Sequence, residues 1–208
     1  MGKTFTAWLL LAAAAAAPAT SPQEVVQSAV THVLRVLDDA KLNAPETSPP
    51  GRLDLEKTRD KIRRIADELF DFNEMARRTL SRHWAARSTA ERSEFVRLYT
   101  ELLKHSYIVR VESYAGEKIV YVGNTVEGQS AVVRSKILTK RGTDTALDYR
   151  LRLTNGRWKV DDVLIDGVSL VANYRSEFNH VIQSSSYAAL IAALRKTVQE
   201  FRTVERRS

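Results

Sequence analysis

Apolar residues recur at helical spacing along the first half of the chain, then at the spacing of strands, and finally at helical spacing again. The run from Val26 to Leu37 repeats at i, i+3 and i+4 and predicts an amphipathic helix. Ser21-Pro22-Gln23-Glu24 comes directly before it and is typical of a helix start, with Ser21 as the N-cap. Three prolines and a glycine follow within 43–52 and predict a loop there.

Three more helices are expected before the spacing changes. One covers 54–69, with apolar residues on one face and charged residues on the other. Asp71-Phe72-Asn73-Glu74 and Ser88-Thr89-Ala90-Glu91 both match the capping box, in which the first side chain and the Glu each bind backbone N–H groups of the first turn. The first opens a short helix through Leu80, and the second opens a longer helix that extends towards Tyr114.

From Glu117 the apolar residues alternate with polar ones, which indicates strands. Strands are expected over 119–122, 129–139, 146–153 and 157–165, with a turn at 141–144. In the third strand Leu147, Tyr149, Leu151 and Leu153 share one side, and Asp148, Arg150 and Arg152 share the other. Asn155-Gly156 predicts a tight hairpin, and Asp161-Asp162 interrupts the alternation and predicts a bulge or bend.

Helical spacing returns after the strands. One helix is expected through Tyr174 and Phe178, and a last one begins after Ser184-Ser185-Ser186. An antiparallel meander with one apolar face needs cover, and the helices on both sides of it in the sequence supply that cover. The sequence therefore predicts an α+β fold in a single domain over 20–208, with a helical part at about 21–115, a sheet at about 117–171 and C-terminal helices at about 172–203.

The N-terminal segment predicts export. Lys3 precedes an uncharged run over 5–17, and Ala17-Pro18-Ala19 offers the small residues that a signal peptidase reads. The run is shorter than the roughly 20 apolar residues that span a bilayer, so 1–19 is interpreted as a signal peptide rather than an anchor. The chain contains no cysteine, which excludes disulfides, lipoprotein processing and cysteine-based metal sites.

Positive charge exceeds negative charge over the sequence. Lysine and arginine number 32 against 25 aspartates and glutamates, a formal net charge of +7. Such a surface favours anionic partners, and acidic lipid headgroups or an acidic protein face suit an exported protein better than nucleic acid does. A basic surface that serves only solubility is the open alternative.

The segment Trp158–Phe178 is the most informative part of the chain. It contains an apolar strand, a turn at Asp166-Gly167 and a run that reads Gly167-Val168-Ser169-Leu170-Val171, followed by Asn173-Tyr174-Arg175. With the segment from Asp71-Phe72 to Trp84, this run resembles the MlaC family of periplasmic phospholipid carriers, also called toluene-tolerance proteins. The resemblance covers nearly the whole chain after the signal peptide. The family usually has an aromatic residue at 161, Glu at 166 and Gly at 81, and these departures leave the ligand subtype open.

The resemblance implies a curved meander of the nuclear-transport-factor-like cone type, covered by helices around an apolar cavity. It implies a phospholipid held by its acyl chains, an inner-membrane ABC lipid transporter complex and an outer-membrane lipoprotein–porin complex as partners, and a role in outer-membrane lipid asymmetry. It implies no cofactor. If the protein is a lipid carrier, the alternative ligand is a hopanoid-type lipid.

Candidate lipid-binding residues are the apolar and aromatic side chains that the pattern places on the inner face. They are Val133, Ile137, Tyr149, Leu151, Val163 and Ile165 from the strands, and Phe70, Phe72, Met75, Tyr107 and Tyr174 from the helices. Each could equally be an ordinary core residue, because an apolar strand face packs more often on a helix than on a ligand. Arg175 could attract a lipid phosphate or pair with Glu177 or Asp166, and the structural role is favoured.

Candidate catalytic residues do not form a constellation. A cavity enzyme needs a buried acid or a His–Asp pair. The candidates are Asp148, Asp161, Asp162, Asp166, His32, His83, His105 and His180. No histidine lies on an expected strand, and the sequence has no HExxH motif, nucleophile elbow or phosphate loop. No enzyme, catalytic residue or metal site is predicted. An exported enzyme acting on a hydrophobic small molecule and an adaptor that binds no ligand are the competing hypotheses.

Overall fold

The computed structural model describes residues 20–42, 52–139, 142 and 144–207. The elements of this part of the chain follow the predicted order of helices, sheet and helices. They are α1 (Pro22–Leu42), α2 (Arg52–Leu69), α3 (Phe72–Leu80), the 3-10 turn η1 (Ser81–His83), α4 (Thr89–Glu112), β1 (Lys118–Glu127), β2 (Ser130–Leu138), β3 (Asp144–Thr154), β4 (Arg157–Ile165), β5 (Val168–Ser169), α5 (Leu170–Ser184) and α6 (Tyr187–Arg207). The predicted signal peptide and most of the predicted loop at 43–52 lie outside the described residues.

The helix starts read from the sequence occur where the pattern places them. At Ser88 the capping box is complete, since its Oγ accepts from the Glu91 N–H (3.2 Å) and its own N–H donates to the Glu91 carboxylate (2.8 Å). At Asp71 only half of the box forms. Its Oδ1 accepts from the Glu74 N–H (2.9 Å), but its own N–H donates to the Val160 carbonyl of β4 instead. This bond ties the start of α3 to the sheet.

The five strands form one open antiparallel meander in the order β1-β2-β3-β4-β5. The prediction ended the first strand at Val122, whereas β1 continues to Glu127 and pairs with β2 throughout. The register shifts between Tyr121 and Gly123, so the glycine marks an irregularity inside the strand rather than its end. Asn155 (φ 51°) and Gly156 (φ 74°) both adopt positive φ and close the predicted hairpin.

The irregularity predicted at Asp161-Asp162 is a β-bulge. Arg150 pairs with Asp162 and the next residue, Leu151, pairs with Val160, which leaves Asp161 as the extra residue of β4. Because of the bulge, both carboxylates are buried.

The two buried carboxylates connect the sheet to the neighbouring helices. Asp161 forms an ion pair with Arg78 of α3 (2.9 Å), and Asp162 accepts hydrogen bonds from the Ser169 hydroxyl (2.6 Å) and the Val171 N–H (3.2 Å) at the start of α5. The bulge therefore fixes the position of α3 and α5 relative to β4.

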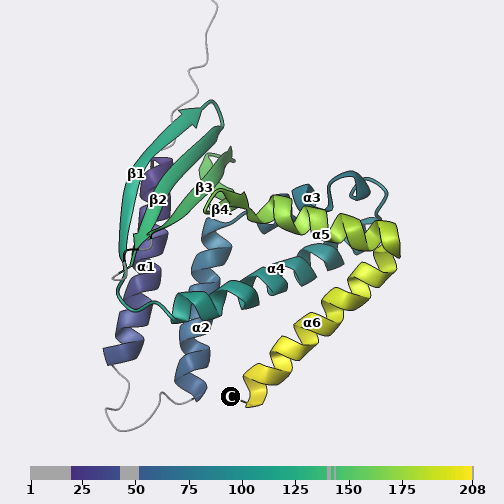
Figure 1. Ribbon diagram of the computed structural model, residues 1–208, viewed down its shortest axis with the longest axis horizontal. Helices are drawn as coiled ribbons and strands as arrows, with labels where there is room; N and C mark the ends of the chain where they lie inside the picture. The colour runs from purple at the N-terminus through teal and green to yellow at the C-terminus, as the bar shows by residue number, and fades with distance from the viewer. Residues whose placement is uncertain (1–19, 43–51, 140–141, 143, 208) are drawn as a thin grey trace, which may run out of the picture.

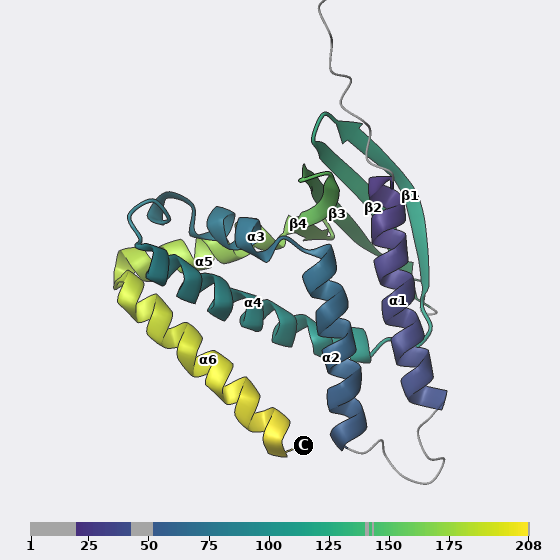
Figure 2. The same ribbon diagram turned by 180° about the vertical axis from the view of Figure 1, so that it is seen from behind.

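The elements gather into two regions. The sheet layer consists of the sheet with α1 and α2 alongside it, and the helical lobe consists of α3, α5, α6 and the first half of α4 (Figures 1 and 2). In the lobe, α6 packs on α4 and α5 rather than on the sheet. The second half of α4 runs back to the sheet layer, where Ile108 packs with Leu37 of α1 and Ile62 of α2. None of the helices in the described part of the chain has both the length and the apolar character that a membrane crossing needs.

Candidate functional site

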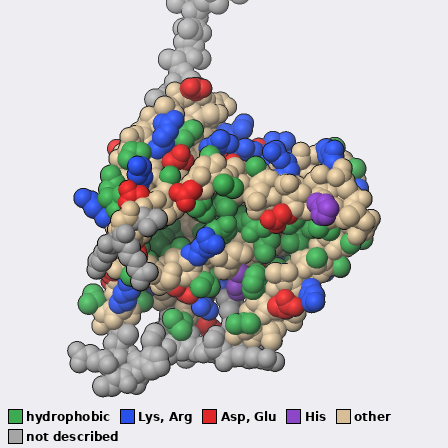
Figure 3. Space-filling view, in the orientation of Figure 1, with side chains coloured by type: hydrophobic (Ala, Val, Ile, Leu, Met, Phe, Trp, Pro, Cys, Tyr) green, Lys and Arg blue, Asp and Glu red, His purple; other side chains and the backbone are tan. Residues whose placement is uncertain are grey.

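A cavity of about 510 Å³ lies between the apolar face of the sheet and the helices of the sheet layer. Its walls come from α1, α2, the segment 70–75, the second half of α4 and the inner faces of β1 to β4. Figure 3 shows hydrophobic side chains gathered in the hollowed centre of the open face. A volume of this size is within the usual range of ligand pockets.

Aliphatic side chains provide most of the lining. The helices contribute Ala29, Val30, Val33, Leu34, Leu37, Ile62, Ile65, Ala66, Leu69, Met75, Leu103, Ile108, Val111 and Leu170, and the strands contribute Ile119, Ile137, Leu147, Val163 and Ile165. Such a wall offers an apolar molecule dispersion contacts but few directional ones.

The phenols that reach the cavity are neutral near pH 7. Burial raises the pKa of Tyr107, Tyr114 and Tyr149 above the ordinary value for a tyrosine. The Tyr114 hydroxyl donates to the Glu117 carbonyl (2.7 Å), so it does not point a free donor at a ligand.

Three cations belong to the lining, and two of them are paired with carboxylates. Arg63 lies 3.2 Å from Asp60, and Lys104 lies 2.6 Å from Asp67. Arg110, on the last turns of α4, has an exposed side chain. The site is therefore an apolar hollow with charge confined to a few positions of its lining.

Comparison with known proteins identifies the family. A sequence model described as "MlaC protein" matches residues 27–196, which is most of the chain. The chain belongs to the MlaC family. It is 25% identical over 168 residues to the toluene tolerance protein Ttg2D of Pseudomonas putida, covering 79% of this chain and 74% of that protein.

A solved structure has the same fold as this MlaC-family chain. It is the phospholipid-binding protein from Ralstonia solanacearum in complex with a phospholipid, with a TM-score of 0.73 and 21% sequence identity. The match covers 88% of this chain and 99% of that one. The α+β architecture inferred from the sequence is thus the architecture of a known phospholipid-binding protein.

The candidate lipid-binding residues occupy three places in the structure. Eight of them line the cavity: Phe70, Phe72, Met75, Tyr107, Ile137, Tyr149, Val163 and Ile165. Val133 and Leu151 are instead buried in the same cluster as Val26 of α1, which covers that end of the sheet. Tyr174 packs in the helical lobe, with its ring 5.6 Å from that of Tyr99. The alternation gives the correct face for Val133 and Leu151, but it does not show which part of that face a helix covers.

The sequence analysis missed the contribution of α1 and α2 to the lining. Val33 and Leu34 of α1 and Ile65 and Ala66 of α2 all face the cavity. Their helical repeat was recognised as an apolar face, but an amphipathic pattern does not say whether that face meets protein or empty space.

The candidate catalytic residues do not line the cavity. Asp161 and Asp162 are held at the bulge, and Asp166 accepts from the Ala146 N–H (2.8 Å) at a turn. His105 is buried against Phe201 with ring centroids 4.7 Å apart. Within the described ranges no group of three or more His, Asp or Glu side chains could hold a metal ion.

Arg175 lies outside the cavity and contributes to a smaller pocket of about 380 Å³ on the helical lobe. This pocket lies between 80–83 and α5. Neither expected acidic partner forms an ion pair with Arg175 among the described residues, and both make other contacts: Glu177 accepts from Asn173 (2.9 Å) and Asp166 accepts from a backbone N–H. The structure therefore supports neither the expected pairing nor a contact of Arg175 with a lipid in the cavity.

Proposed function

We propose that this MlaC-family chain is a periplasmic carrier that holds a phospholipid by its acyl chains in the cavity of the sheet layer. The observation that carries the proposal is the hollow of about 510 Å³, which the apolar faces of the sheet and of α1, α2 and α4 leave unfilled. Family membership and the phospholipid in the related Ralstonia structure support the same ligand class.

The energetics of a lipid in water fit such a wall. Hydrating each methylene costs about 0.8 kcal/mol, so two acyl tails together cost roughly 20 kcal/mol or more. This is close to the ceiling of non-covalent affinity, about 18 to 21 kcal/mol. A carrier must replace the bilayer around the tails and still release them, and an aliphatic wall with few polar contacts meets both needs.

We further propose that the carrier exchanges lipid with an inner-membrane ABC transporter complex and an outer-membrane lipoprotein–porin complex, and so serves outer-membrane lipid asymmetry. Family membership supports these partners, and the net charge of +7 suits docking on acidic surfaces. The direction of transport follows from the relative affinities of the partners, since a passive carrier moves lipid down that gradient.

Mass spectrometry of the purified protein after organic extraction tests the proposal. We expect phospholipid in near-stoichiometric amount, and the same spectrum reports the number of acyl chains. An extract that contains no lipid from fully folded protein would support the adaptor hypothesis instead. A terpenoid lipid in place of phospholipid would identify the hopanoid-type alternative.

A further inference from the structure

The three cations of the cavity lining differ in one respect. Arg63 and Lys104 each have a carboxylate partner, Asp60 and Asp67. Arg110 has no carboxylate within ion-pair distance among the side chains described in 20–42, 55–139 and 144–204, and its own side chain is exposed. An exposed guanidinium beside an apolar hollow is available to an anionic ligand.

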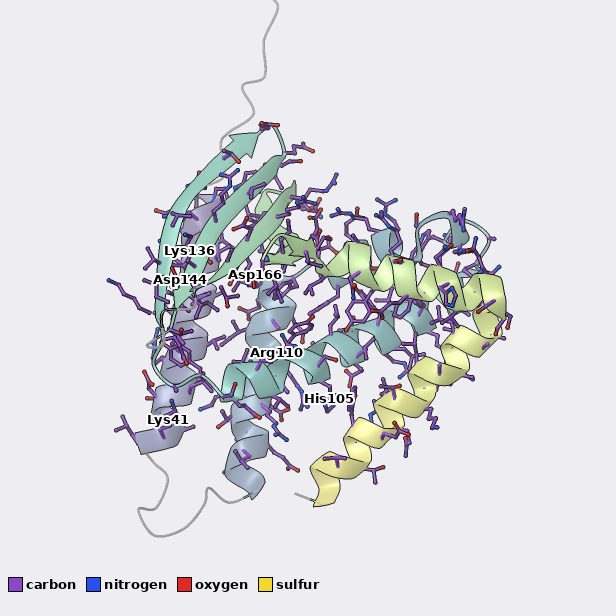
Figure 4. The ribbon with its side chains drawn as sticks, in the orientation of Figure 1. Lys41, His105, Arg110, Lys136, Asp144 and Asp166 are labelled. Atoms are coloured by element: carbon purple, nitrogen blue, oxygen red, sulfur yellow. The ribbon has the colours of Figure 1, made fainter. Side chains whose placement is uncertain are left out.

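The position of Arg110 is set by its helix and by an aromatic ring. Figure 4 labels it near the middle of the open face, next to the hydrophobic surface that the space-filling view shows in the same orientation. Its guanidinium carbon lies 5.6 Å from the centroid of the Tyr107 ring, one turn earlier on α4, and both residues line the cavity. This cation–π contact holds the charge at the edge of the cavity without neutralising it.

The acidic residues that follow Arg110 along the chain bind elsewhere. Both carboxylate oxygens of Glu112 accept from Arg59, at 2.6 and 3.0 Å. Glu117 accepts from the Ala115 N–H at 2.8 Å. These contacts leave Arg110 as the lining cation that a ligand can approach without breaking an ion pair.

We propose that Arg110 binds the phosphate group of the lipid whose acyl chains fill the cavity. This inference rests on the proposed function. A guanidinium can donate two parallel hydrogen bonds to phosphate oxygens, which gives it both affinity and orientation. Every glycerophospholipid carries this phosphate, so Arg110 would separate phospholipids from neutral lipids with the same tails but would not distinguish among headgroup alcohols.

The test compares two ligands with identical tails. Delipidated wild type, Arg110→Gln and Arg110→Lys are titrated with vesicles that contain dioleoyl phosphatidylglycerol or dioleoylglycerol in a common host lipid, and the transferred ligand is quantified. Arg175→Gln is the matched control, because it removes the same charge from an exposed arginine outside the cavity. Unfolding curves of all variants confirm that each is folded.

We expect Arg110→Gln to weaken phosphatidylglycerol binding about tenfold and to leave dioleoylglycerol binding within about twofold of wild type. Arg110→Lys should retain part of the affinity, because an ammonium keeps the charge but loses the two-pronged geometry. Arg175→Gln should bind both ligands like wild type. Equal losses for both ligands in Arg110→Gln would make Arg110 a wall residue and overturn the inference, as would no loss for either.

A titration with inorganic phosphate identifies the source of the anion. Phosphate that binds the wild type but not Arg110→Gln, without any difference between the two lipids, would assign the site to free phosphate and overturn its role in lipid binding. Wild-type protein that binds neither lipid would reject the proposed function and this inference together. Wild-type protein that binds both lipids, with an unchanged preference in Arg110→Gln, would reject only the inference.

Discussion

The helical lobe and the sheet layer both bury apolar faces, yet aromatic rings fill the centre of the lobe and a cavity lies within the sheet layer. In the lobe the rings of Phe95, Tyr99 and Phe178 lie within 6.0 Å of one another, and all three side chains are buried. In the sheet layer, aliphatic residues of α1 and α2 face the strands across about 510 Å³ of open space.

The contrast shows that hydrophobic burial and close packing are separate properties of a fold. Three aromatic side chains between crossing helices fill the space that those helices enclose, and they stabilise the molecule. Val26 of α1 and Leu69 of α2 pack on the strands at one end of the sheet, but the aliphatic side chains farther along both helices leave the cavity unfilled. The lobe is joined to the sheet layer through the contacts that Asp161 and Asp162 make with α3 and α5.

The largest expected loss of stability comes from removing an aromatic ring from the helical lobe. Phe95 is 0% exposed and contacts two other rings, so Phe95→Ala should lower the free energy of unfolding by about 4 kcal/mol. Phe72 lines the cavity, so Phe72→Ala should cost only about 1 to 2 kcal/mol, since one side of that ring already lacks packing partners. Urea unfolding of delipidated protein measures both. Equal costs would mean that the two regions are packed alike.

The next effect concerns the connection between the regions. Asp162 is 0% exposed and accepts from Ser169 and Val171, so Asp162→Ala leaves two donors without their acceptor and should cost about 3 kcal/mol. Asp148→Ala, on the charged face of β3, should change the stability by less than about 0.5 kcal/mol. The same unfolding assay checks the pair, and a small cost for Asp162→Ala would show that the bulge does not hold α5.

The local signals in the sequence were sufficient for most of the fold. The caps at Ser21 and Ser88 and the hairpin at Asn155 depend on residues within a few positions of each other, so a single sequence contains the whole signal. The first strand, predicted over 119–122, is too short, because it continues through an irregularity at Gly123 that alternation alone does not predict.

The candidate site was predicted less completely, because it depends on distances between elements. Alternation places Tyr149 and Leu151 on the same face, and both are buried in the cluster with Val26, but only Tyr149 also lines the cavity. Tyr174 and Arg175 belong to the most specific run of the sequence, yet both lie on the helical lobe. A motif shows that a segment matters without showing that it touches the ligand.

A matched pair of alanines sharpens the comparison of filled and hollow regions. Ala76 of α3 is 0% exposed in the lobe, so Ala76→Leu should overpack it and cost about 1 to 3 kcal/mol. Ala66 of α2 faces the cavity, so Ala66→Leu should change the stability by less than about 1 kcal/mol, because the added atoms enter open space. Leucine and alanine have similar helix propensities, which keeps the backbone contribution small in both variants.

Lipid content provides the second measurement for this pair. Ala66→Leu should reduce the lipid recovered by extraction, because it occupies cavity volume, while the folded fraction of Ala76→Leu should retain wild-type content. The reverse result, with Ala66→Leu strongly destabilised and its lipid content unchanged, would place the hollow elsewhere.

The smallest expected effect is at Tyr121, where the packing of the sheet layer leaves a polar group unsatisfied. Its hydroxyl is buried and has no hydrogen-bond partner among the described residues, and burial raises the pKa of Tyr121 to about 12. The pKa in the folded state lies above the unfolded value of about 10. The contribution of the neutral phenol to stability is therefore complete below pH 10 and is lost as the pH rises towards 12.

Tyr121→Phe removes both the unpaired hydroxyl and the titration. It should raise the free energy of unfolding at pH 8 by up to about 1 kcal/mol, and it should reduce the loss of stability between pH 8 and pH 10.5. A variant less stable than wild type at pH 8 would show that the hydroxyl has a partner, such as a bound water or the ligand itself.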